Sequence, residues 1–76
     1  MTNPATTGDD IAAELQSTRD ALNELERRSP RRSARLRLDF LDVRTEHQAL
    51  RLNDHELLSA TRRIREEAQS AAASAA

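Results

Sequence analysis

Six arginines gathered within eleven residues are the part of this chain best suited to chemistry. They lie in residues 27–37, and no acidic residue stands among them. The planar guanidinium group binds phosphates and carboxylates through paired hydrogen bonds. The block therefore predicts contact with the phosphates of a nucleic acid or with an acidic protein surface. Its members are Arg27, Arg28, Arg31, Arg32, Arg35 and Arg37.

The same block also has a purely structural interpretation. Residues 1–26 carry six acids and one arginine, a net charge of −5, which the arginines balance. Arg27 and Arg28 also suit the negative end of a helix dipole. No aromatic residue stands among the arginines, so the block offers no platform for base stacking. The sequence leaves both interpretations open: a solvated turn, or a binding site for phosphates or an acidic partner.

The two histidines give little support for catalysis or metal binding. His47 and His55 have acidic neighbours, among them Asp54 and Glu56. Di-metal sites in helical bundles use a Glu three residues before a His, and neither His has one. The chain has no Cys, and Gly8 is its only glycine, so thiolate ligands and glycine-rich phosphate loops are excluded. We expect no catalytic residue, metal or cofactor.

Apolar spacing predicts the helices that must carry these residues. From Leu36 to Ala68, one mostly apolar line of residues has alternating spacings of four and three along the sequence. This is the spacing of a long helix that packs along another helix, as in a coiled coil. We expect one long second helix and assign its seam to an oligomer interface made of Leu36, Phe40, Val43, His47, Leu50, Leu57 and Ile64.

A shorter first helix is predicted over about residues 10–28. Asp9 or Asp10 would cap it, and Ser29-Pro30 would end it and begin the next helix. A second apolar stripe on the long helix, opposite the seam, would receive this first helix in a hairpin. The residues expected to pack within the hairpin are Ile11, Leu15, Leu22, Leu25, Leu38, Leu41 and Leu52.

The segment Asn53-Asp54-His55-Glu56 supports an alternative with three helices. Asn53 suits a helix cap, and Glu56 stands three residues later, as in a capping box. Asp54 falls in the seam, where two copies facing each other would be costly. We favour the continuous helix because no Gly or Pro follows Pro30. A three-helix bundle with a break near Asn53 remains the alternative.

Composition sets the domain organisation. Leu, Ile, Val and Phe supply 14 of 76 residues, a small core for a single chain, so we expect self-association, with a dimer favoured. Residues 1–9 are expected to be a disordered tail, residues 10–70 the helical domain, and residues 71–76 an Ala/Ser tail. No apolar run approaches the length of a membrane span. We expect no membrane partner and a cytoplasmic location.

The pattern resembles small helical-hairpin dimers such as the Rop-type RNA-binding bundles of plasmids. The resemblance lies in the periodicity of residues 10–70 and includes no motif, so no residue role is carried over. The sequence as a whole favours an all-α, non-enzymatic module for protein interaction or assembly that acts as an oligomer with a protein partner. A small nucleic-acid-binding regulator that uses the Arg27–Arg37 block is the alternative.

Overall fold

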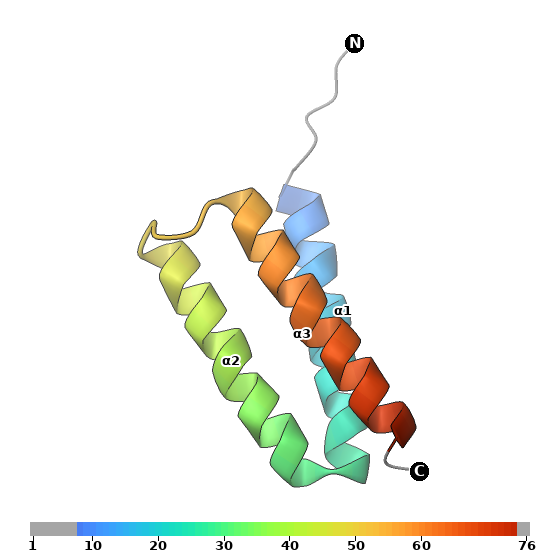
Figure 1. The fold of residues 1–76 in the computed structure, drawn as a ribbon. Helices are drawn as coiled ribbons and strands as arrows, with labels where there is room; N and C mark the ends of the chain where they lie inside the picture. The colour runs from blue at the N-terminus through green and yellow to red at the C-terminus, as the bar shows by residue number, and fades with distance from the viewer. Residues whose placement is uncertain (1–7, 75–76) are drawn as a thin grey trace.

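Three α-helices make up the part of the chain that the computed structural model describes, which is residues 8–74 with the backbone alone at Asp9. They are α1 (Gly8–Arg28), α2 (Pro30–Gln48) and α3 (Asp54–Ser74). Successive helices run in opposite directions, and α3 lies along α1 (Figure 1). The all-helical class is confirmed, and the three-helix alternative fits. The expectation of one continuous second helix is wrong.

The predicted ends of the domain differ slightly from the observed ones. Helix α1 begins at Gly8, so Asp9 and Asp10 belong to its first turn and do not precede it as expected. Helix α3 continues to Ser74, and Ala72 is buried, so the domain extends beyond residue 70. Residues 1–7 and 75–76 of the expected tails lie outside the described residues.

The link between α1 and α2 is a single residue. Helix α1 ends at Arg28, as expected, and Ser29 occupies the N-cap position of α2 with Pro30 in the first turn. The Ser29 side chain makes no capping hydrogen bond. The fixed φ of Pro30 suits the start of a helix, and its missing N–H costs nothing there. This tight turn makes α2 fold back beside α1.

The break between α2 and α3 is made by two complementary end motifs. At the end of α2, Leu50 N–H donates to the His47 carbonyl at 3.0 Å and Arg51 N–H donates to the Glu46 carbonyl at 2.9 Å. These two bonds form a Schellman motif, with Leu50 in the left-handed region at φ 65°. The helix therefore stops at Gln48 although no Gly or Pro stops it.

A capping box then begins α3. Asn53 Oδ1 accepts the Glu56 N–H at 2.8 Å, and Glu56 Oε1 accepts the Asn53 N–H at 2.9 Å. Each side chain thus satisfies a backbone donor that the new helix leaves free. Asp54 and Glu56 place negative charge at the positive end of the α3 dipole. The sequence signal at Asn53 predicted this start correctly.

The core lies between the three helices and is closed within one chain. Leu22 and Leu25 of α1 are fully buried beside Leu36 and Phe40 of α2. Helix α3 completes it with Ile64 and two small residues. Leu15, Val43 and Ala71 pack against the cluster from its edges, and the buried cluster itself consists of Ala21, Leu22, Leu25, Leu36, Phe40, Ile64, Ala68 and Ala72.

The hydroxyl groups of the buried residues Thr18, Ser33 and Thr61 are all hydrogen-bonded, and Thr61 Oγ1 donates to the Leu57 carbonyl at 2.9 Å. Thr18 Oγ1 donates to the Glu14 carbonyl at 2.8 Å, and the Thr61 carbonyl lies 3.4 Å away across the α1–α3 contact. Ser33 Oγ donates to the Leu22 carbonyl at 3.0 Å and ties α2 to α1. Among the described residues, no buried side-chain nitrogen or oxygen lacks a hydrogen-bond partner. The polar groups therefore add little burial cost.

The two apolar stripes of α2 differ in burial from what the sequence suggested: the Leu36 stripe is buried within the chain, and the stripe expected to receive α1 is exposed. Leu36, Phe40, Leu57 and Ile64, assigned to an oligomer interface, are buried by the chain's own helices. Val43 packs at the edge of the same core, and His47 is half-buried. The break turns α3 back so that it covers the α2 seam, which a continuous helix could not do for itself.

The residues assigned to packing within the hairpin differ in how far they are buried. Leu22 and Leu25 are buried, and Ile11, Leu15 and Leu52 are half-buried. Two further leucines of that set, Leu38 and Leu41, are exposed. Leu50, assigned to the seam, lies in the link and is 90% exposed.

Candidate functional site

The outer face of α2 carries an apolar stripe that no other described helix covers. Leu38 is 65% exposed and Leu41 is 57% exposed. Ala34 and Thr45 continue the line at helical spacing and are also exposed. We call Ala34, Leu38, Leu41 and Thr45 the outer stripe. At about 100° per residue the outer stripe lies on the side of α2 opposite Leu36.

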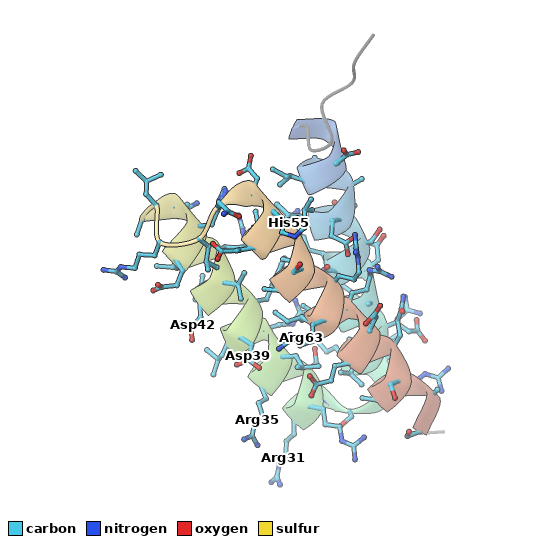
Figure 2. The ribbon with its side chains drawn as sticks, turned by 45° about the horizontal axis from the view of Figure 1, so that its top comes forward. Arg31, Arg35, Asp39, Asp42, His55 and Arg63 are labelled. Carbon is cyan, nitrogen blue, oxygen red and sulfur yellow. The ribbon has the colours of Figure 1, made fainter. Side chains whose placement is uncertain are left out.

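Four charged residues follow one another in a segregated order on the flank of α2 between the outer stripe and the side that faces α3. Figure 2 shows Arg31, Arg35, Asp39 and Asp42 following one another along α2 from its first turn. We call these residues the charged border. None of the four side chains makes an ion pair or a hydrogen bond with another described residue. The border therefore presents two cations and then two anions, all available to a partner.

The arginine block divides into a neutralised half and an unpaired half. Arg27 and Arg28 both pair with Glu24, at 3.5 Å and 3.3 Å. Arg37 pairs with Glu26 at 2.7 Å and donates to Asn23 Oδ1 at 2.8 Å. The pairs of Arg27 and Arg28 lie within α1, whereas Arg37 joins α2 to α1.

The unpaired half consists of Arg31, Arg32 and Arg35 at the start of α2. Arg31 and Arg32 lie in the first turn, and that turn contains no acidic residue. Positive charge is unfavourable at this end of a helix, where the dipole already presents its positive pole. An anionic group placed here would relieve both the dipole and the arginines.

Two hollows between α2 and α3 are lined by residues of both helices. One is lined by Arg32, Arg35, Leu36, Asp39, Glu67 and Ala71. The carboxylates of Asp39 and Glu67 oppose the two arginines there, so the hollow has no net preference for an anion. The other is lined by Val43, His55, Glu56, Ser59, Ala60 and Arg63.

The histidines have separate roles. His47 Nε2 lies 2.8 Å from Asp54 Oδ1, a contact that joins the end of α2 to the start of α3. His55 is exposed, and its side chain has no hydrogen-bond partner among the described residues. Over residues 8–74, no group of three or more His, Cys, Asp or Glu side chains converges as a metal site would.

The sequence placed Leu38 and Leu41 on a second apolar stripe but did not indicate that this stripe is exposed. A heptad pattern shows two apolar stripes and does not say which one faces the core. The useful signal was the spacing from Ala34 to Thr45 together with the order of charges from Arg31 to Asp42. The order of charges can influence the binding of a partner only when the stripe beside it is exposed.

Within the described range, no helix combines the length and the apolar character that spanning a membrane requires. The chain matches no protein-family model, and neither the curated proteins nor the solved structures give a significant match.

Proposed function

We propose that this chain is a non-enzymatic protein-interaction module whose docking surface is the outer face of α2. The observation that carries the proposal is the exposure of Leu38 and Leu41 side by side on a helix whose other face fills the core. Single exposed leucines are ordinary on protein surfaces. Two at helical spacing, with unpaired charges along one side, form a surface to which another helix can bind.

The size of the outer stripe sets the strength of the contact. Covering the exposed parts of Leu38 and Leu41 contributes on the order of 2–3 kcal/mol. Association costs roughly 4–15 kcal/mol in lost translational and rotational freedom. The stripe alone is therefore too small for a permanent complex. It suits a weak, reversible contact in which the charged border sets the orientation of the partner.

The charges favour a protein over a nucleic acid as the partner. Asp39 and Asp42 lie on the same helix as the unpaired arginines and would repel a phosphate backbone. Phe40, the chain's only aromatic residue, is buried and offers no face for stacking. A surface that mixes leucines with charges of both signs matches the composition of a helix partner better.

One observation keeps a nucleic-acid-binding regulator as a second candidate. Arg31, Arg32 and Arg35 have no acidic partner among the residues that the structure describes, and the first two stand at the positive end of α2. If they bind phosphates, affinity for labelled DNA or RNA falls steeply with added salt. Replacing the three by Gln then removes the binding. Fluorescence anisotropy at low salt measures this binding. If the unaltered chain does not bind DNA or RNA under these conditions, the nucleic-acid candidate is excluded.

A photo-crosslinking amino acid at position 38 tests the protein-interaction function. In the native host, illumination should attach a polypeptide at position 38, and mass spectrometry should identify it. The same group at exposed Gln69 on α3 is the control and should give no specific adduct. An additional Leu41→Glu change should suppress the adduct at position 38. Equal labelling at both positions contradicts the proposal.

A further inference from the structure

We infer that the outer stripe binds a second copy of the same chain, with the two α2 helices antiparallel about a two-fold axis between residues 39 and 40. The inference rests on the proposed protein-interaction function and names the partner. It is argued from the order of side chains along α2, first the apolar ones and then the charged ones.

The apolar residues of the outer stripe match their own reversed order. A two-fold axis between residues 39 and 40 places Leu38 against Leu41 of the second copy, and Leu41 against Leu38. The same operation places Ala34 against Thr45, a small residue against a small residue. Each layer therefore fills similar volume, as an antiparallel helix pair with a repeat of three and four requires. The leucines lie at the centre of the contact.

In this orientation the charged border of one copy lies beside the charged border of the other. In an antiparallel pair with this register, Arg35 lies beside Asp42 of the second copy, and symmetry repeats the contact. A parallel pair would set the border of each copy beside the opposite flank of the other, where Asp42 meets only Arg37, which Glu26 already pairs, and Arg35 meets no acidic residue. Because none of the four side chains pairs with another described residue, the new ion pairs replace no observed ones. The contact between Arg35 and Asp42 thus favours the antiparallel arrangement.

The other side of the stripe opposes the pairing only weakly. There Arg37 comes beside Arg44 of the second copy. Arg37 is already paired with Glu26 at 2.7 Å, and the Arg44 guanidinium lies 5.7 Å from the centre of the Phe40 ring. Glu26 therefore offsets the like charges. The whole contact is small, and we expect a dissociation constant on the order of 10⁻⁴ M.

Charge reversal provides the decisive experiment because the two reversed chains should bind each other. Arg35→Asp and Asp42→Arg each turn two attractive contacts into two repulsive ones and should raise the homodimer dissociation constant at least about tenfold. An equal mixture of the two variants should form a heterodimer of roughly the unaltered affinity. The double variant should form a homodimer again. Sedimentation equilibrium measures all four, and circular dichroism confirms unchanged helicity.

Engineered cysteines test the orientation directly, since the chain has none of its own. Under mild oxidation, the Ala34→Cys variant should crosslink with the Thr45→Cys variant in a mixture faster than either variant crosslinks with itself. If the Ala34→Cys variant instead formed its disulfide-linked homodimer faster than the mixed product, the pair would be parallel and the inference would be overturned.

Other outcomes also overturn the inference without deciding the proposed function. A chain that stays monomeric up to about ten times the expected dissociation constant, or a dimer that Leu38→Glu leaves intact, does not self-associate through this stripe. The crosslinker at position 38 then separates the two claims. An adduct with a different protein retains the proposed function and rejects self-docking, whereas no specific adduct rejects both.

Discussion

Leu50 holds a backbone conformation that leucine rarely adopts. Its φ of 65° places it in the left-handed region, and its side chain is 90% exposed. Packing therefore does not compensate for the strain, which amounts to about 1–2 kcal/mol for an L-residue. Glycine is the usual residue at this position of a Schellman motif.

Leu50→Gly is therefore expected to stabilise the chain by about 1 kcal/mol, since it relieves strain and removes no packed side chain. Thermal or urea unfolding followed by circular dichroism measures the change. Leu50→Ala is the matched control, because it shortens the side chain but keeps the strain, and it should leave stability nearly unaltered. Equal stabilisation by both changes would mean that the exposed side chain, and not the backbone, is unfavourable.

The Arg65–Glu14 contact is the most sheltered ion pair among the described residues. Arg65 Nε lies 2.7 Å from Glu14 Oε2, with the two side chains 23% and 13% exposed. We expect a coupling energy of about 1–2 kcal/mol from a double-mutant cycle with alanine at both positions. The exposed pair of Arg28 and Glu24 is the control and should give less than about 0.5 kcal/mol. Similar values for both pairs would contradict this ranking.

At the scale of elements, the start of α3 depends on one reciprocal pair of hydrogen bonds. Asn53→Ala removes the acceptor for Glu56 N–H and should lower the unfolding free energy by about 1 kcal/mol. Asn53→Ser should retain most of that stability because Ser also caps helices. Equilibrium unfolding of the three chains provides the measurement. A neutral Asn53→Ala would show that α3 is held by packing alone.

The sequence predicted the helices better than it predicted their faces. Ser29-Pro30 and the Asn53 capping box are local signals, and both mark true helix ends. The stop at Gln48 has no such signal, since Leu50 takes a position that normally shows a Gly. The heptad spacing of the sequence continues through residues 49–53, so the pattern predicted one helix where the structure has two. Local chemistry locates caps, whereas the buried face is decided only when three helices pack together.

The candidate site depends on the same global choice. Nothing near Leu38 distinguishes it from Leu36 as a type of residue, yet one is 65% exposed and the other 5%. The difference arises because α3 folds back over the Leu36 side of α2. The sequence also could not predict that Arg31 and Arg35 lack ion pairs, because the packing of α1 against α2 decides which arginines the glutamates of α1 contact. In the folded chain Glu26 pairs with Arg37, although Arg31 is closer to it in the sequence.

At the scale of the whole molecule, the difference in burial between the two stripes gives a direct test of the fold. Leu36→Ala empties part of a small core and should lower stability by about 2–4 kcal/mol, most of what a chain of this length has. Leu38→Ala, which removes the same atoms from the surface, should cost less than about 0.5 kcal/mol at low protein concentration. Thermal melts compare the two. The reverse order would restore the assignment of the Leu36 seam to the outside.

The two links described in the fold also bear on how fast the bundle forms. One residue joins α1 to α2 and five join α2 to α3, so each antiparallel pairing closes only a short loop and requires little search. The contact between α1 and α3 then follows with both helices already held nearby. Such local connectivity is associated with folding in roughly microseconds to milliseconds. A chain that exposes an apolar stripe in its finished state thus spends very little time exposing its core as well.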